Sequence, residues 1–350
     1  MKTIEVSASG SYQVKIGSGL LSTLGVQVAG ICRSGTAAIV SDSNVWPLYG
    51  QIATESLEKA GFRVVSFVFF AGEESKNGQT YLELLNFLAS RQMTRSDCLI
   101  ALGGGVVGDL TGFAAATYLR GIAYIQVPTT LLAAVDSSVG GKTAIDLPAG
   151  KNLAGAFYQP RLVLCDTDTL TTLPEEIFRD GCAEVIKYGV LYDPQLFSQL
   201  MLSGPDFDRE SVIARCVELK RDVVALDEFD NGLRQKLNLG HTVGHGIEGH
   251  SNFTVSHGRA VAMGMAIVAR AAAAGGLCSQ ADADAIVQIL ERFHLPTGTD
   301  CAAEDIYRCA LSDKKRSGGK VNLIVPRAVG RCDILPTPVE ELKSFIEAGL

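Results

Sequence analysis

Four of the chain's five histidines stand in one short segment, residues 237–257: His241, His245, His250 and His257. His241 and His245 are four residues apart and share one face of a helix, as in helices that bind zinc, but the Glu that metalloproteases carry after the first His is missing. A catalytic zinc ion takes three protein ligands and keeps one position open, and histidines alone could supply all three. Spacing alone nominates His241 and His245 as the helical pair.

A polar stripe accompanies these histidines if the segment is helical. Its members follow steps of four, three, four and three residues: Arg234, Asn238, His241, His245 and Glu248. Three glycines lie between them, at 240, 244 and 246, and each costs about 1 kcal/mol relative to Ala inside a helix. We therefore expect something to approach this backbone closely, and favour a functional site over a solvated face.

A second pair of charged residues stands upstream, in "GCAEVIKYGV". Glu184 and Lys187 are three residues apart and share one face of a helix. A purely structural ion pair and a functional pair are both open for these two residues.

A run of glycines, Gly103 to Gly105, follows the apolar segment "CLIAL" and opens a helix-like stretch. Glycines at a strand-to-helix turn let backbone amides approach a phosphate at the positive end of the helix. The run does not match G-x-G-x-x-G, so helix–sheet packing is the competing interpretation. Asp109, in the first helical turn, suits either a cap or a ribose hydroxyl.

The segment "VDSSVGGKTAID" contains GGKT, which looks like the end of a P-loop. A P-loop also needs Gly five residues before Gly141, and Asp136 stands there, which excludes an NTPase motif. What remains is a Gly-Gly turn that presents Lys142, followed by "GKN", which presents Lys151 and Asn152. Their small and apolar neighbours favour anion binding over ordinary solvated lysines.

The composition is that of a globular protein, with 47% hydrophobic and 20% charged residues. The formal net charge of −7 argues against nucleic-acid or membrane partners, so any bound anion needs locally placed cations. The N-terminus has no signal-peptide core, and the longest apolar stretch is broken by Arg270, which indicates a buried helix. Nine cysteines without C-x-x-C spacing indicate reduced thiols in a cytosolic protein.

Strand-like and helix-like segments alternate up to about residue 170. Short apolar runs cover 36–42, 62–70, 98–103, 123–128 and 161–166, helix-like stretches cover 77–91 and 106–118, and runs near 3–7 and 12–16 predict a hairpin. Ala-rich stretches with helical spacing follow. The pattern predicts an α/β Rossmann-like domain with a mostly parallel sheet over 1–172, then an all-α domain over 173–350. A cleft between two such domains is the expected site.

Four blocks together resemble the 3-dehydroquinate synthase family: "GGGVVGDLTGFAAATYLRG", "QVPTTLLAAVDSSVGGKTAIDLPAGKNLAGAFYQP", "GCAEVIKYG" and "LNLGHTVGHGIEG…SHGRAVAMGM". The resemblance implies a phosphate-eliminating lyase of the shikimate pathway. Such an enzyme converts 3-deoxy-D-arabino-heptulosonate 7-phosphate to 3-dehydroquinate and phosphate, with NAD⁺ and one divalent metal ion, Zn²⁺ or Co²⁺. It further implies a cytoplasmic homodimer, with NAD in the first domain and metal and substrate in the second.

The resemblance reassigns the metal site. Its ligands match Glu184, His241 and His257, whereas His245 matches a histidine that faces the substrate and takes part in proton transfer. His250 matches no functional position and is expected at the surface. After "HG" the family usually has Glu, and here Arg259 stands beside His257, so the partner of that ligand is expected to differ.

The remaining matches concern substrate and cofactor. The residues implied to hold the substrate are Arg120, Asp136, Lys142, Lys151, Asn152, Lys187, Lys220, Arg234, Asn238 and either Lys314 or Lys315, with Arg120 possibly acting from the partner subunit. The residues implied to bind NAD are Asp42, Asn44, Glu73, Lys76, Gly104, Gly105, Asp109, Thr129, Thr130, Thr169 and Thr172, together with Lys142 and Lys151.

Three other functions compete with this interpretation. A sugar phosphate cyclase of the valiolone or inosose type is the nearest, although its relatives usually alter the GGKTAID and GKN segments. A metal-dependent NAD polyol dehydrogenase and a non-catalytic binding protein are more distant.

Overall fold

The computed structural model describes residues 1–32, 35–252, 254–314 and 319–350, and the chain forms two compact units. The first unit comprises Met1–Leu173 and Arg209–Phe229, and the second comprises Pro174–Asp208 and Asp230–Leu350. This differs from the predicted division at 172/173, because helix α7 (Arg209–Leu226) belongs to the first unit. Lys220 of α7 explains the difference, since its ammonium donates to the carbonyl of Asp136 at 2.6 Å.

A seven-stranded sheet forms the centre of the first unit, in the order β1-β2-β9-β6-β5-β3-β4. Its strands are β1 (Lys2–Ser7), β2 (Ser11–Gly17), β3 (Thr36–Asp42), β4 (Arg63–Phe69), β5 (Cys98–Gly103), β6 (Ala123–Pro128) and β9 (Leu162–Asp166). Only the β1–β2 pair is antiparallel; the other neighbours are parallel. The predicted mostly parallel sheet and its hairpin are therefore confirmed.

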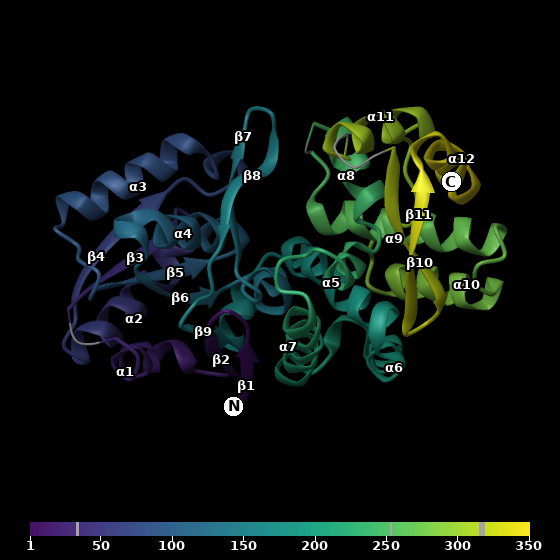
Figure 1. Ribbon diagram of the computed structural model, residues 1–350. Coiled ribbons are helices and arrows are strands. Elements are labelled where there is room, and N and C mark those ends of the chain that lie inside the picture. Colours follow the sequence, from purple (N-terminus) through teal and green to yellow (C-terminus); the bar gives the residue numbers. More distant parts are fainter. Residues whose placement is uncertain (33–34, 253, 315–318) are drawn as a thin grey trace. The chain divides into compact units, whose positions relative to one another are not determined.

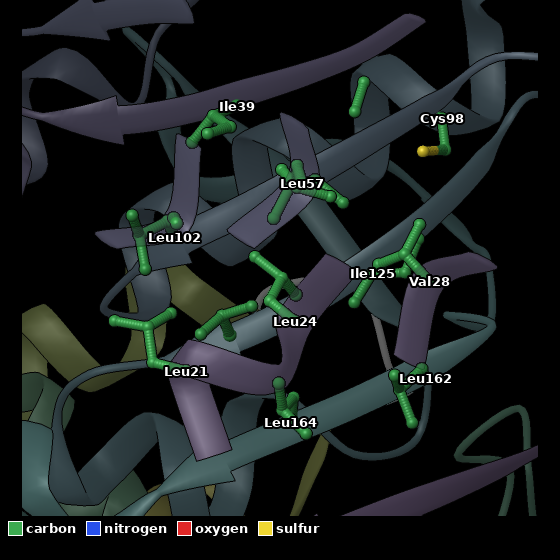
Figure 2. Packing of buried hydrophobic residues seen from close by; sticks show 14 of the residues in the cluster. Leu21, Leu24, Val28, Ile39, Leu57, Cys98, Leu102, Ile125, Leu162 and Leu164 are labelled. Atoms are coloured by element: carbon green, nitrogen blue, oxygen red, sulfur yellow. The ribbon is translucent and has the colours of Figure 1, made fainter. Parts of the chain in front are cut away.

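Helices cover both faces of this sheet (Figure 1). On one face α1 (Leu24–Ala29) and α2 (Trp46–Lys59) pack on a cluster of buried residues that includes Leu24, Val28 and Ile125, shown in Figure 2. On the other, α3 (Gly78–Ser90) and α4 (Gly105–Thr117) pack on a cluster that includes Leu84 and Leu110. Burial on both faces explains why the central strands are continuous apolar runs. A separate hairpin, β7 (Lys142–Leu147) and β8 (Gly150–Phe157), completes the unit.

The second unit is mainly helical, as predicted. Its helices are α5 (Glu175–Tyr192), α6 (Pro194–Ser203), α8 (His241–His250), α9 (His257–Ala274), α10 (Gln280–Arg292), α11 (Ala303–Lys314) and α12 (Val339–Gly349). One antiparallel hairpin, β10 (Lys320–Ala328) and β11 (Arg331–Pro338), is an addition that the sequence did not predict. None of the described helices has the length and hydropathy that a membrane span requires.

The polar stripe is not one continuous helix. Arg234 and Asn238 lie in a 3₁₀ turn, Leu233–Asn238, and Gly240 has a left-handed backbone (φ 77°) that begins a new helix at His241. A side chain is disfavoured there by conformation, and a Cβ would also lie 2.7 Å from the carbonyl oxygen of Val261.

Backbone packing between α8 and α9 explains the glycines of the histidine segment. A Cβ at Gly244 would lie 2.9 Å from the carbonyl oxygen of Ala260, and one at Gly264 would lie 2.0 Å from that of Gly240. A Cβ at Gly246 would meet the Ile306 carbonyl of α11 at 2.5 Å. The close approach expected from the sequence is therefore helix–helix packing, and it fixes where α8 presents its histidines.

Substituting Gly264→Ala should destabilise the protein, because the new methyl group overlaps the Gly240 backbone and the two helices must separate. Overpacking of this kind costs about 1–3 kcal/mol. Thermal unfolding measures the effect, at roughly 2–4 °C per kcal/mol. Gly298→Ala is the control, because a Cβ there meets open space. Equal midpoints for the two variants would contradict this account of the packing.

Candidate active site

Three potential metal ligands converge inside the second unit. Glu184 comes from α5, His241 opens α8 and His257 opens α9. Oε1 of Glu184 lies 3.4 Å from Nε2 of His241 and 3.4 Å from Nε2 of His257. The ligand atoms of the three residues all lie within 4.8 Å of one another. The structure thus brings together the ligand set that the family resemblance implied.

The donor chemistry and spacing fit a divalent ion. Bonds of about 2.0–2.1 Å in a tetrahedral shell place ligand atoms roughly 3.3 Å apart, close to the two measured separations. Oε1 of Glu184 is buried and has no hydrogen-bond partner among the described residues, so a cation would satisfy it. The backbone carbonyl of Leu239 lies 3.0 Å from Nδ1 of His241. A proton on Nδ1 leaves the Nε2 lone pair facing Glu184.

Lys187 determines which oxygen of Glu184 faces the histidines. The two residues form a buried ion pair through Oε2, with exposures of 1% for the Lys187 side chain and 0% for that of Glu184. The sequence left open whether this pair is purely structural or functional. The structure shows an ion pair, and one of its members, Glu184, is itself a candidate metal ligand. Its position one turn along α5 leaves Oε1 for the histidines.

The protonation states also suit a cation site. Burial alone would raise the pKa of Glu184, but Lys187 and His241 lower it well below the ordinary value. Burial and the neighbouring Lys187 lower the pKa of His241 to about 4, so this imidazole is neutral at pH 7. Burial lowers the pKa of His257, but the interactions of the imidazole with the carboxylates of Glu184 and Glu248 outweigh burial and raise the pKa to about 10. Positive charge is therefore favoured between these carboxylates.

A second cluster shares His257: His245, Glu248 and His257 also place one ligand atom each within 4.8 Å. Oε2 of Glu248 lies 3.6 Å from Nδ1 of His257 and 3.9 Å from Nε2 of His245. These separations are wider than those of a tetrahedral shell, so the first cluster is the better cation site. His241 and His245, which spacing alone nominated as a pair, occur together in neither cluster of the described residues.

The other residues of this segment have distinct surroundings. The His245 side chain is 40% exposed, so its imidazole is open to solvent. His250 is exposed at the end of α8, as expected. Arg234 is buried and Asn238 is half-buried in the turn before α8. Arg259 is exposed, and its backbone N–H donates to Asp180 at 2.9 Å.

In the first unit, the residues implied to bind NAD follow the carboxyl ends of adjacent parallel strands. Asp42 ends β3, Gly104 and Gly105 follow β5, Thr129 and Thr130 follow β6, and Thr169 and Thr172 lie in the turn after β9. The chain leaves β3 for the outer strand β4 and then returns to β5 on the other side of β3. Ligands of open α/β sheets bind at such a switch point, outside the carboxyl ends of the strands.

Several of these side chains also have structural roles. Oδ1 of Asp42 accepts from the backbone of Asn44 at 2.8 Å and so shapes the turn before α2. A Cβ at Gly104 would lie 3.0 Å from the Thr130 side chain, a tight contact that favours glycine for packing reasons as well. The Thr169 hydroxyl donates to the carbonyl of Asp166 at 2.7 Å, and that of Thr172 lies 2.6 Å from the Tyr49 hydroxyl.

Lys76 joins the nucleotide-binding candidates to the β7–β8 hairpin. Its ammonium lies 3.0 Å from Glu73, 3.3 Å from Asp109 and 3.8 Å from Asp146, and it donates to Oδ1 of Asn152 at 2.8 Å. Burial opposes the charge of Lys76, but Asp109 and Glu73 outweigh it and raise the pKa. Burial also raises the pKa of Asp109 to about 6, although Lys76 acts in the opposite direction.

The remaining candidates are distributed over the first unit and the tail of α11. Lys220 donates to Asp136 through both the carbonyl and the carboxylate. Lys142 begins β7 after Gly141, and Lys151 lies in β8. Arg120 is exposed with a left-handed backbone, φ 65°. The Lys314 side chain and all of Lys315 lie outside the described residues.

Two acidic residues in these clusters had no role in the sequence interpretation, Asp146 and Glu248. Asp146 stands in "GGKTAID" and accepts the Asn152 backbone N–H at 2.8 Å. Glu248 stood in the polar stripe, three residues after His245, so its spacing was the available signal.

Comparison with known proteins gives one family over most of the chain. Residues 66–180 match the 3-dehydroquinate synthase N-terminal family model and residues 181–316 match the C-terminal model. A 3-dehydroquinate synthase from Enterococcus faecalis is 42% identical, with 100% of both chains covered. One from Pelobacter propionicus is 47% identical, with 95% of each chain covered.

Solved structures share the fold. A 2-deoxy-scyllo-inosose synthase complexed with carbaglucose-6-phosphate, NAD⁺ and Co²⁺ aligns at a TM-score of 0.89 and 27% identity over 100% of both chains. A 2-epi-5-epi-valiolone synthase from Streptomyces hygroscopicus with NAD⁺ and Zn²⁺ bound aligns at 0.88 and 26% identity over 98% of both chains. A glycerol dehydrogenase from Schizosaccharomyces pombe, at 0.66 and 16% identity, shows likeness of fold alone.

Zinc should stabilise the chelator-treated protein, because a ligand that binds only the folded state raises the free energy of unfolding by about 4 kcal/mol at a thousand times its Kd. We expect His241→Ala and His257→Ala to abolish the rise in the unfolding midpoint. His250→Ala, an exposed histidine on the same helix, is the matched control and should keep it. A full zinc-dependent rise in His257→Ala would contradict the ligand set.

The Asp109→Asn variant should change how stability depends on pH. The pKa of Asp109 is about 6 in the folded chain against an ordinary 3.8, so between these values the unfolded chain has released a proton that the folded chain holds. This carboxyl's contribution to stability therefore falls as pH rises from about 4 to about 6. The variant should gain stability relative to wild type over this range, by on the order of 2 kcal/mol. Urea unfolding at both ends measures it, and a difference independent of pH would contradict the raised pKa.

Proposed function

The chain belongs to the 3-dehydroquinate synthase family, and from this membership we propose that it converts 3-deoxy-D-arabino-heptulosonate 7-phosphate to 3-dehydroquinate and inorganic phosphate. The reaction eliminates phosphate without net oxidation, because a hydride removed from the substrate is later returned to it. An intramolecular aldol step then closes the ring.

Besides family membership, one observation supports this proposal: the ligand atoms of Glu184, His241 and His257 lie within 4.8 Å of one another. Two imidazole nitrogens and one carboxylate oxygen form the open, three-ligand set of a catalytic zinc or cobalt site. When bound, the ion supplies a Lewis acid for a substrate hydroxyl, and NAD⁺ supplies a reversible hydride acceptor. NAD⁺ would lie at the strand ends that carry Asp42, Gly104 and Thr129, a placement supported by the sheet's switch point.

The chain's own side chains prepare these steps. Lys187 holds Oε2 of Glu184 and so directs Oε1 toward the two histidines. His245 exposes its imidazole beside this cluster and is proposed to take and return a proton at Nε2. Lys220 neutralises Asp136 and holds that carboxylate in one place, ready for the substrate hydroxyls.

Cations and amides account for the anionic groups of the substrate. We assign the phosphate and carboxylate to Lys142, Lys151, Asn152, Arg234, Asn238, Arg120 and either Lys314 or Lys315. Fixed positive charge around a leaving phosphate stabilises the charge that develops on it. Because the net charge of the chain is −7, an anionic substrate has to be held by cations placed locally around it.

We assign NAD binding to the first unit, and metal and substrate binding mainly to the second. All nine cysteines lie among the described residues and none of them forms a disulfide, which supports a reducing compartment such as the cytoplasm. A homodimer is proposed on family grounds, without nucleic-acid or membrane partners.

Phosphate release from two sugars tests the proposed substrate. The purified protein with NAD⁺ and zinc should release phosphate from 3-deoxy-D-arabino-heptulosonate 7-phosphate and not from sedoheptulose 7-phosphate. The identity of 42–47% to dehydroquinate synthases, against 26–27% to the two cyclases, favours this outcome. Release from sedoheptulose 7-phosphate alone would assign the chain to the valiolone-type cyclases instead.

NADH absorbance during turnover separates the cyclase from a polyol dehydrogenase. A cyclase returns every hydride, so absorbance should stay constant while phosphate accumulates. His250→Ala should match wild type in this assay, whereas His257→Ala should lose phosphate release. NADH that accumulates in proportion to consumed substrate would overturn the proposed reaction in favour of a dehydrogenase.

A further inference from the structure

We propose that Glu248 is a positioning residue that orients the imidazole of His257 toward the metal ion. The inference rests on the proposed function in one respect, namely that His257 is a metal ligand. The family resemblance assigns Glu248 no role, and its carboxylate lies beside Nδ1 of His257, the ring nitrogen that does not face Glu184.

The two nitrogens of His257 face two different carboxylates. Nε2 lies 3.4 Å from Oε1 of Glu184, and Nδ1 lies 3.6 Å from Oε2 of Glu248. An imidazole that donates its Nδ1 proton to Glu248 keeps the lone pair of Nε2 for a cation beside Glu184. A ring flipped by half a turn would aim carbon atoms at both carboxylates, so Glu248 selects one ring orientation and one tautomer.

The position of Glu248 is fixed by packing. It is 3% exposed, and its helix α8 is pressed against two neighbours through glycines that leave no room for a side chain. α9 approaches at Gly244, and α11 approaches at Gly246. A carboxylate held at a buried position needs compensating partners. The nearest histidines are His257 and, at 3.9 Å, His245 of the same helix.

The 3.6 Å between Nδ1 of His257 and Oε2 of Glu248 is longer than a hydrogen bond, so the two groups interact through their charges. A small rotation of the imidazole would bring the two atoms to hydrogen-bond distance. A cation on Nε2 makes the Nδ1 proton more acidic and the hydrogen bond to a carboxylate stronger. Metal-bound histidines almost always donate their other N–H in this way, and loss of the partner typically lowers metal affinity about 10–100-fold.

The residue two positions after His257 cannot accept the Nδ1 proton, because it is Arg259 and a guanidinium has no acceptor. Family members usually carry Glu two residues after this histidine, where the chain has Arg259. Arg259 is exposed, and its backbone N–H is bonded to Asp180 of α5. The carboxylate beside Nδ1 therefore comes from position 248 and not from position 259.

Metal affinity tests this role independently of catalysis. Zinc Kd is measured for the full chain, stripped with a chelator, by competition with a chromophoric chelator. Glu248→Gln should weaken zinc binding about 10–100-fold, because the neutral amide no longer strengthens the imidazole as a donor. Glu248→Asp keeps the charge and should recover part of this affinity. Glu304→Gln, which removes a carboxylate paired with Lys343 on α12, is the control and should bind as wild type does.

The visible spectrum of the Co²⁺-loaded protein is a second readout. Glu248→Gln should shift its ligand-field bands, and Glu304→Gln should not. Circular dichroism of the metal-free variants verifies folding. If Glu248→Gln does not fold, the test uses Glu248→Asp, for which we expect a smaller loss of zinc affinity and a Co²⁺ spectrum close to that of wild type.

Three outcomes would overturn the inference. Wild-type zinc affinity in both folded Glu248 variants would show that His257 needs no orienting carboxylate. Loss of zinc binding as complete as in His257→Ala would make Glu248 a ligand. Undiminished binding in His257→Ala would remove the ligand set of the proposed function itself, a failure that is distinguishable because it does not involve Glu248.

Discussion

The arrangement of the helical unit depends on a carboxylate that is entirely withdrawn from water. Glu184 is fully buried on α5, and a lone charge there would cost several kcal/mol. Lys187 compensates one oxygen, and the imidazoles of His241 and His257 face the other. This charge balance requires three helices to present side chains to one point, and it makes the same point attractive to a divalent cation. Replacing Lys187 alone would leave Oε2 of Glu184 uncompensated, whereas replacing both Glu184 and Lys187 would remove the cation site.

Glycine makes that convergence possible. Packed helix axes usually lie about 8–10 Å apart, and small residues at a crossing allow the backbones to approach more closely. Gly244 and Gly264 allow α8 and α9 to touch through their backbones, and Gly258 does the same beside Asp180 of α5, where a Cβ would meet the carbonyl oxygen at 2.0 Å. The ligand geometry is therefore specified by residues without side chains as much as by the ligands.

Local sequence patterns predicted most of the first unit. The strands at 36–42, 98–103 and 123–128 have the predicted bounds, because continuous apolar runs between glycine-rich turns leave few alternatives. Spacing failed where tertiary contacts decide. It paired His241 with His245, whereas the cluster that contains His241 is completed by residues of two other helices. Spacing had included His257 among four candidate histidines and Glu184 in an ion pair, but only the family resemblance joined these two residues with His241. The polar stripe likewise contained Glu248 but could not show that a left-handed Gly240 separates it from Arg234. The placement of α7 rests on contacts between distant parts of the chain, with β1 and with Asp136, which accepts from Lys220 over a separation of 84 residues.

One lysine in the first unit has a thermodynamic consequence. Lys76 is bonded at once to Asp109, beside the glycine turn of α4, and to Asn152 on the β7–β8 hairpin, where the backbone is left-handed at φ 56°. A ligand that draws the ammonium toward the strand ends weakens its bond to Asn152, and a ligand that recruits Asn152 frees the ammonium. Linkage makes the two effects equal in free energy. A ligand at the strand ends and a ligand at the hairpin would therefore be coupled through this one ammonium group, which contacts both regions.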